Sequence, residues 1–354
     1  MKDKNIVQEN FTPQRVSKVI ARAGIASRRE VERMIAQQRV KVNGILLERA
    51  AVNVMSTDHI EVDGVPLRKA ERTRLWLYHK PIGLVTTHSD PDGRSTVFDN
   101  LPSIFSRVIS VGRLDINTEG LLLLTNDGGL ARVLELPSTQ WLRVYRVRFH
   151  GQVDQDKLNL LKKGIVIQGI CYGDMQVTLD TQKGSNAWVT VGLREGKNRE
   201  IKKVFEFFNW KVNRLIRISY GPFQLGTLLA GSTREVSKKI LREQLGPHLL
   251  EEAQVNLDAP IYSSETLVRD RPNIISEVPD DFTRMKKNSS QKNGLSKQKK
   301  LATPVHRRKL ASNVWMAKGI HSSFLSDSGQ REENHRRSPS FPSKRSLRRT
   351  SAKK

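Results

Sequence analysis

A polar loop with a glycine near each end contains the residue types best suited to chemistry. It spans residues 111–120 and leads directly into an apolar run, 121–125, that is typical of a buried strand. A loop fixed to a rigid strand can hold a reactive side chain in one position. Its Asp115 lies two residues from Arg113, and a nearby cation favours the ionised, nucleophilic carboxylate. An aspartate in such a loop is more often a turn residue, so the spacing alone does not select Asp115.

Motifs for cofactors and metals are missing from the sequence. There is no Walker loop, no Gly-x-Gly-x-x-Gly after a strand, no His-Glu-x-x-His and no paired-cysteine zinc spacing. The eight histidines are scattered, and the single cysteine, Cys171, excludes an internal disulfide and is expected to be a small, half-buried residue in a strand. A reaction must therefore use carboxylates, hydroxyls and cations, and we expect no cofactor and no metal.

The charge of the chain indicates a polyanionic partner. With 61 Lys and Arg against 36 Asp and Glu, the 354 residues carry a formal net charge of +25. Residues 281–354 alone hold 20 basic and 4 acidic residues. The first 11 residues are polar and the longest aliphatic run is 121–124, so we expect neither a signal peptide nor a membrane span, and a cytoplasmic protein.

The elements that must position this loop begin with a small N-terminal module over 14–70. Apolar residues at helical spacing over 16–23 predict a first helix, and Ser27 with Glu30 forms a capping box that opens a second. Asn43-Gly44 and Asp63-Gly64 are typical of hairpin turns. Six cations lie on or beside the two helices: Arg15, Lys18, Arg22, Arg28, Arg29 and Arg33. Few acidic residues balance them, which favours phosphate contacts over a merely solvated face.

A second domain over 73–250 interleaves strands and helices, and therefore reads as α+β. Strands are predicted at 75–78, 121–125, 141–149 and 212–220, and a helix at 198–208 with Asn198 as its expected cap. Beyond residue 250 the periodicity ends. Residues 251–354 are predicted to be a disordered tail, strongly basic from 281.

Several motifs resemble known families. Residues 14–24, 27–30 and 40–44 are similar to the S4-like RNA-binding module of a small-subunit ribosomal protein and several RNA-modifying enzymes. Residues 112–115, followed by 120–128, resemble the signature of pseudouridine synthases, in the branch of ribosomal small-subunit synthase A and large-subunit synthases B, E and F. The order of the further matching motifs agrees with that family: 80–83, 143–147, 195–203 and 214–217.

The resemblance implies a mixed α+β catalytic domain with a largely antiparallel sheet, which converts uridine to pseudouridine without a cofactor. Asp115 would be catalytic, either by adding covalently to the nucleotide or by abstracting a proton from the ribose. Tyr145 matches the tyrosine that stacks on the target base, although its strand face also fits a core aromatic. Lys202 matches the basic partner of the aspartate, with Lys203 as its competitor.

The same resemblance implies an RNA path lined by seven cations: Lys80, Arg113, Arg143, Lys197, Arg199, Arg214 and Arg217. Each is also compatible with an ordinary surface position. Arg113 could fill the stack left by an extruded uridine, pair with Asp115, or do both at different stages.

Residues 90–99 and the long basic tail look closest to the large-subunit synthase B type. We therefore expect a monomeric enzyme that acts on large-subunit ribosomal RNA or an assembly intermediate. The alternatives are a small-subunit rRNA synthase and a non-catalytic ribosome-assembly factor that keeps the fold. The intact set Asp115, Tyr145 and Lys202 favours an enzyme over the assembly factor.

Overall fold

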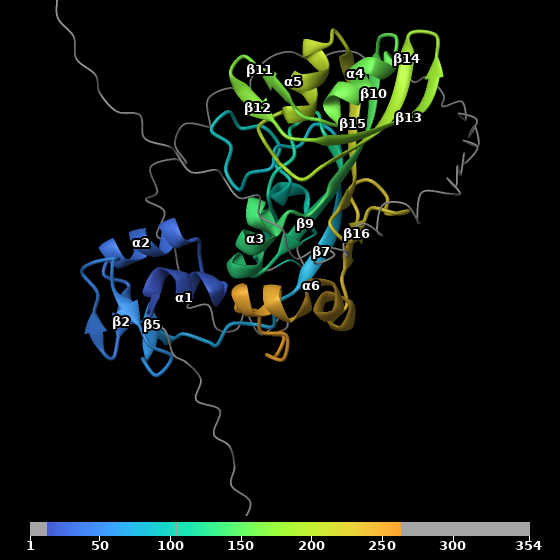
Figure 1. Cartoon of the computed structure of the whole chain (residues 1–354). Helices are drawn as coiled ribbons and strands as arrows, with labels where there is room; N and C mark the ends of the chain where they lie inside the picture. The colour runs from blue at the N-terminus through green and yellow to red at the C-terminus, as the bar shows by residue number, and fades with distance from the viewer. Residues whose placement is uncertain (1–12, 103–104, 106, 263–354) are drawn as a thin grey trace, which may run out of the picture. The chain divides into compact units, whose positions relative to one another are not determined.

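The computed structural model describes residues 13–102, 105 and 107–262, which all fall within one compact unit of the chain. Its N-terminal module follows the predicted order of two helices and hairpins (Figure 1). The elements are β1 (Gln14–Arg15), α1 (Val16–Arg22), α2 (Arg28–Ala36), β2 (Val40–Val42), β3 (Ile45–Leu46), β4 (Asn53–Val54), β5 (Ile60–Val62) and β6 (Val65–Pro66).

Local sequence signals account for this module. The Ser27 hydroxyl accepts a hydrogen bond from the Glu30 amide at 3.1 Å, which confirms the predicted cap of α2. Asn43 and Asp63 adopt left-handed backbone conformations, with φ of 52° and 54°, at the two predicted hairpin turns. Strands β3-β2-β5-β6 form a four-stranded sheet whose buried residues pack against both helices.

A nine-stranded, mostly antiparallel sheet forms the second domain, as predicted. The strand order is β13-β14-β10-β15-β9-β7-β17, with β16 paired to β15 and β8 paired to β9. Within this described sheet, β9 and β15 are the parallel pair. The strands are β7 (Leu75–Lys80), β8 (Ile109–Val111), β9 (Glu119–Thr125), β10 (Arg143–His150), β13 (Met175–Lys183), β14 (Asn186–Leu193), β15 (Lys211–Tyr220), β16 (Phe223–Gln224) and β17 (Thr233–Glu235). A separate hairpin consists of β11 (Ile165–Ile167) and β12 (Ile170–Tyr172).

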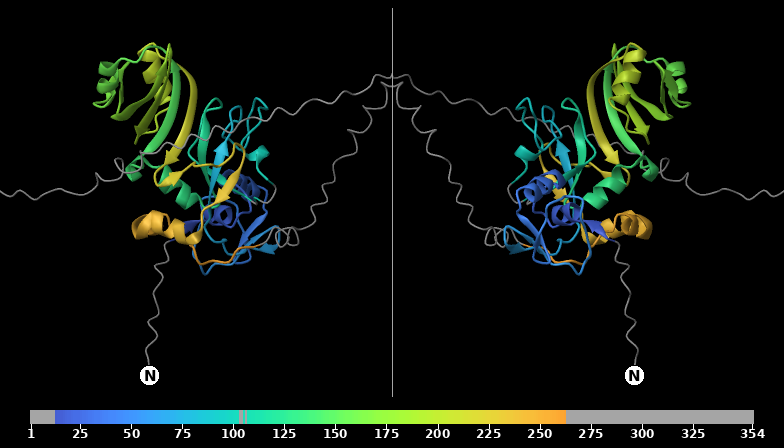
Figure 2. Two further views of the ribbon diagram at one scale, coloured as in Figure 1. Left: turned by 90° about the vertical axis from the view of Figure 1, so that its right-hand side faces the viewer. Right: turned by 90° about the vertical axis from the view of Figure 1, so that its left-hand side faces the viewer.

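The helices cover the sheet at two ends. They are α3 (Gly128–Glu135), α4 (Gln155–Leu161), α5 (Glu200–Phe207) and α6 (Lys238–Glu252), with short 3-10 turns at Phe98–Asn100 and Pro137–Thr139. In Figures 1 and 2, α4 and α5 lie toward one end of the sheet and α3 and α6 toward the other. Two hydrophobic clusters correspond to these ends, so the domain has a divided core.

The sheet has two halves, β13-β14-β10-β15 and β9-β7-β17, which meet where β9 pairs with β15. Gly120 has a φ of +105°, and a Cβ atom there would overlap the backbone of Arg217. The register pairs Glu119 with Ile216 and Gly120 with Arg217. A glycine at the start of β9 is therefore what allows this close approach.

Three local predictions were wrong. Helix α5 begins at Glu200, because Arg199 adopts a left-handed conformation with φ of 52°, and Asn198 does not cap it. Cys171 lies on β12 as expected of a strand residue, but it is exposed rather than half-buried. The boundary placed after residue 250 falls inside α6.

The chain beyond α6 packs against the domain for another ten residues. Ala253 and Leu257 are buried, and the amides of Thr73 and Arg72 donate to the carbonyls of Asn256 and Pro260 at 2.8 and 3.0 Å. These backbone bonds and buried side chains hold the segment after α6 against the domain, although the helical periodicity of the sequence has ended. The rest of the predicted tail, including its basic part from 281, lies outside the described residues.

Candidate active site

Asp115 lies in the loop between β8 and β9, and its backbone is fixed on both sides. The preceding Leu114 is buried, and its carbonyl accepts a hydrogen bond from the Thr86 hydroxyl at 2.9 Å. The Thr118 amide donates to the Asp115 carbonyl at 2.9 Å, which closes a turn. The buried β9 that follows anchors the loop, as the sequence indicated.

Lys202 is the cation that reaches the Asp115 carboxylate. Its Nζ donates to Asp115 Oδ2 at 2.9 Å, and the two side chains are 17% and 36% exposed. Helix α5 presents Lys202 on its half-buried side, whereas Lys203 is exposed. Of the two lysines left open by the sequence, the structure therefore pairs Lys202 with Asp115.

A cavity of about 1130 Å³ surrounds this pair. It brings together residues from both halves of the sheet, including eight that the sequence singled out: Arg113, Asp115, Arg143, Tyr145, Lys197, Arg199, Lys202 and Arg217. In the described part of the chain, no group of three or more His, Cys, Asp or Glu side chains is arranged to hold a metal ion. Eight Arg or Lys residues and four carboxylates line the cavity, so its lining is basic overall.

Tyr145 lies between the hydrophobic core and the cavity. It is half-buried on β10 and packs against two hydrophobic clusters, while its side chain also lines the cavity. Val147 and Phe149, on the same face of the strand, are fully buried. The strand therefore fixes Tyr145 at the boundary between core and cavity.

Arg143 and Arg217 form the cavity wall from within rather than as surface cations. Arg143 is 7% exposed and donates to the Glu195 carbonyl and the Tyr220 hydroxyl, both at 3.1 Å. Arg217 is 2% exposed and donates through Nε to the Leu121 carbonyl at 2.7 Å. Its buried Nη2 has no hydrogen-bond partner among the described residues. Both guanidinium groups lie over the Tyr220 ring, at 4.9 and 5.0 Å from its centroid.

The other predicted cations of the RNA path divide into two groups. Arg113 and Arg199 are exposed and line the cavity, and their side chains form no hydrogen bond or ion pair with another described residue. Lys197 forms an ion pair with Glu195 at 2.5 Å, which raises the pKa of Lys197. Arg214 pairs with Glu119 at 2.6 Å and does not line the cavity.

The prediction that Lys80 lines the RNA path is wrong. Its side chain is fully buried, and its Nζ donates to the carbonyls of Pro81, Ile116 and Thr118 at 3.0, 3.4 and 2.9 Å. Burial lowers the pKa of Lys80 to about 8, although the nearby Asp115 carboxylate acts in the opposite direction. Lys80 therefore fastens the loop that contains Asp115.

Glu200 is a cavity residue that sequence reasoning missed. It is 4% exposed at the start of α5, and its Oε2 accepts a hydrogen bond from the Lys197 amide at 3.0 Å. Burial raises the pKa of Glu200 to about 7. Two sequence signals separate this glutamate from the exposed Glu206: Glu200 lies within the matching motif 195–203, and it precedes the buried Val204 by four residues, one helical turn.

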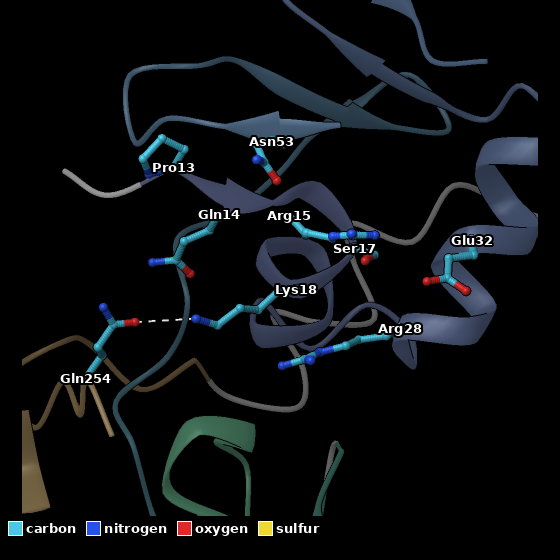
Figure 3. A pocket seen from close by; sticks show the side chains of 9 residues that line it. All are labelled: Pro13, Gln14, Arg15, Ser17, Lys18, Arg28, Glu32, Asn53 and Gln254. Carbon is cyan, nitrogen blue, oxygen red and sulfur yellow. Dashed lines mark hydrogen bonds between the residues drawn. The ribbon is translucent and has the colours of Figure 1, made fainter. Parts of the chain in front are cut away.

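A second hollow, of about 500 Å³, contains three predicted cations of the N-terminal module (Figure 3). Arg15, Lys18 and Arg28 line it from β1, α1 and α2. Lys18 Nζ donates to Gln254 Oε1 at 3.4 Å, and burial together with the neighbouring arginines lowers the pKa of Lys18. Arg29 is exposed outside the hollow.

Arg22, one of the cations predicted to contact RNA, is instead paired with a buried carboxylate of the catalytic domain. It forms an ion pair with Asp127 Oδ2 at 2.6 Å, and the two side chains are 20% and 4% exposed. It also donates to the Gln254 carbonyl. Nearby, Arg107 Nη1 donates to the Ala21 carbonyl at 2.8 Å, and burial lowers the pKa of Arg107. Helix α1 is thus fastened to the catalytic domain, a role that its sequence did not indicate.

Comparison with known proteins identifies two families in the chain. Residues 74–207 match the family model of RNA pseudouridylate synthase, and residues 14–60 match that of the S4 domain. A Rickettsia felis protein described as an uncharacterized RNA pseudouridine synthase is 49% identical over 233 residues, which cover 65% of this chain and 100% of that protein.

Two further relatives bear the name ribosomal large subunit pseudouridine synthase B. The Pasteurella multocida protein is 42% identical over 69% of this chain and 73% of its own length. The Haemophilus influenzae protein is 42% identical over 63% of this chain and 66% of its own length. Together with both family models in the expected order, these matches show that the chain belongs to the RNA pseudouridine synthases, in the branch of ribosomal small-subunit synthase A and large-subunit synthase B.

Proposed function

We propose that this enzyme isomerises a specific uridine in large-subunit ribosomal RNA, with Asp115 as the catalytic carboxylate. The names of the relatives from Pasteurella multocida and Haemophilus influenzae support the substrate. The observation that carries the catalytic assignment is the 2.9 Å contact between Lys202 and Asp115 inside a basic cavity. An ionised carboxylate held by one cation and open to a cavity is suited to nucleophilic or base chemistry.

In the reaction, the uracil base is detached from the ribose and is then attached again through a different ring atom. The bond from the ribose C1′ to N1 of uracil breaks, the base turns, and C1′ joins C5. The hydrogen on C5 is lost and N1 gains one, so product and substrate are isomers. Asp115 acts either by adding to C1′ or by taking a proton from the ribose, and both routes need its charged form next to the sugar.

The remaining cavity residues have roles that follow from their positions. Tyr145 presents an aromatic ring from a fixed strand, on which the uracil can stack. Arg113 and Arg199 are exposed cations at the cavity and bind phosphates or fill the space of the extruded base. In the N-terminal module, Arg15 and Arg28 bind a part of the RNA that is remote from the reacting uridine.

Chemical mapping of pseudouridine in total rRNA tests this function. Cells without the gene should lack one or more pseudouridines in large-subunit rRNA, and the wild-type gene should restore them while Asp115→Asn should not. A missing modification in small-subunit rRNA would overturn the choice of subunit. An unchanged map of both rRNAs would overturn ribosomal RNA as the substrate.

A further inference from the structure

Two exposed isoleucines lie on the turns beside Asp115. Ile116 follows Asp115 directly, lines the cavity and is 36% exposed, and Ile82, in the turn after β7, is 59% exposed. Isoleucine is among the most frequently buried residue types. Single exposed apolar side chains are common, so exposure alone assigns no role. Two features distinguish Ile82 and Ile116 from the other exposed apolar residues. They lie on turns next to Asp115, and hydrogen bonds connect the backbones of these turns.

The two turns are fastened to each other. The Gly83 amide donates to the Ile116 carbonyl at 2.8 Å. The buried Lys80 ammonium donates to the carbonyls of Pro81, Ile116 and Thr118, so it joins the residue before Ile82 to Ile116 itself. The turn that contains Ile82 is therefore fixed to Ile116, which lines the cavity, so the two isoleucines do not stand on independent loops.

Two apolar side chains on connected turns fit a specific step of the reaction. A uridine in a paired stem must leave the base stack before its sugar can reach Asp115, and unstacking costs roughly a few kcal/mol. Apolar side chains that enter a base step offset part of this cost, alongside a cation such as Arg113 that occupies the vacated stack. A β-branched side chain is stiff about χ1, so little conformational entropy is lost on contact.

We propose that Ile82 and Ile116 pack against the nucleobase next to the target uridine and fill space that the extruded base leaves. This inference rests on the proposed function, since it requires that a uridine enters the Asp115 cavity. It makes the isoleucines determinants of which uridines are modified: they favour targets inside a stem, where extrusion is costly. They have little effect on a uridine that is already unpaired.

Two synthetic hairpins with the sequence around the mapped uridine provide the test. In one, the uridine is paired with adenosine, and in the other the opposing nucleotide is removed. Single-turnover rates are measured at saturating RNA for wild type, Ile82→Ala, Ile116→Ala and the double variant. Ile240→Ala, on α6 and 48% exposed, is the matched control, and Ile116→Val keeps the branched side chain.

We expect the double variant to slow the paired hairpin about tenfold and the unpaired hairpin less than about twofold, the order expected when aliphatic side chains lose an apolar contact. Ile240→Ala and Ile116→Val should behave as wild type. Equal slowing on both hairpins, or no slowing on either, rejects the inference alone. If Ile116→Ala does not fold, the test uses Ile82→Ala alone, whose side chain is more exposed. The ratio of its rates on the paired and unpaired hairpins then decides whether the inference holds. A wild-type enzyme that modifies neither hairpin rejects the proposed function and this inference with it.

Discussion

At the scale of single residues, the contact between Asp115 and Lys202 joins positions 87 apart in the chain. We predict that Asp115→Asn abolishes pseudouridine formation and leaves RNA affinity within about a few-fold, because the amide keeps the shape of the side chain but not its charge. Product analysis and RNA binding of the purified proteins check this, with the exposed Asp156→Asn as a control. Substantial turnover by Asp115→Asn would remove it from the reaction.

The adjacent lysines of α5 provide an internal comparison. Lys202→Gln should slow single-turnover chemistry about tenfold or more, since the carboxylate loses its only cation within hydrogen-bond distance among the described residues. Lys203→Gln removes the same charge from an exposed position one residue away and should have little effect on the rate. Similar losses in both variants would indicate a general effect of charge instead of a specific pair.

At the scale of elements, the start of α5 contains a buried carboxyl whose protonation affects stability. The pKa of Glu200 is about 7 in the folded protein against an ordinary value of 4.5, so folding binds a proton between these pH values. The stabilising effect is present below about pH 4.5 and is lost as the pH rises through 7, by an amount on the order of 3 kcal/mol.

Glu200→Gln keeps an oxygen that can accept from the Lys197 amide but cannot ionise. It should raise the melting temperature at pH 8 and leave it almost unchanged at pH 5, as measured by thermal unfolding. Glu206→Gln, exposed on the same helix, is the control and should show no such pH dependence. An equal change at both pH values would contradict a role for ionisation.

Helix α1 carries cations with two different tasks. Arg22→Met should lower the free energy of unfolding by about 2 kcal/mol, because it leaves the buried Asp127 carboxylate without its ion-pair partner. Arg15→Met and Arg28→Met should leave stability nearly unchanged and weaken RNA binding, since these side chains line an open hollow. Urea unfolding and RNA titration of the three variants separate the tasks. A destabilised Arg15 variant, or weaker binding by Arg22→Met alone, would reverse the assignment.

The sequence predicted those features that depend on neighbours along the chain. The Ser27 cap and the Asn43-Gly44 turn follow from side-chain and backbone preferences of a few residues. Lys80 and Arg22 were misplaced because a lysine or arginine is nearly always at the surface, and only tertiary contacts with three carbonyls or with Asp127 reverse that preference. The family resemblance identified Lys202 as the partner of Asp115. Whether Lys202 or Lys203 points toward Asp115, however, depends on the residue at which α5 begins.

At the scale of the whole chain, the basic segment from residue 281 carries 20 basic and 4 acidic residues. Removing it should flatten the salt dependence of RNA binding, because each phosphate contact contributes roughly −0.9 to the slope on a duplex. Turnover of a saturating fragment and the choice of uridine should not change, since the cavity lies within the described residues. Titrations from low to high salt with the full and shortened proteins measure the difference. Identical slopes would leave this segment without a role in RNA binding.

The short parallel pairing of β9 with β15 joins two segments of the chain that are synthesised at different times. Leu121 of β9 leaves the translating ribosome early, whereas Arg217, which donates to the Leu121 carbonyl, follows 96 residues later. At about 5–20 residues per second, this interval lasts roughly 5–20 s. Lys202 itself follows Asp115 by 87 residues, so the carboxylate is without its ion-pair partner for most of this interval. The cavity around Asp115 is therefore complete only after β15, which contributes Leu215, Arg217 and Tyr220 to its lining, has emerged and paired.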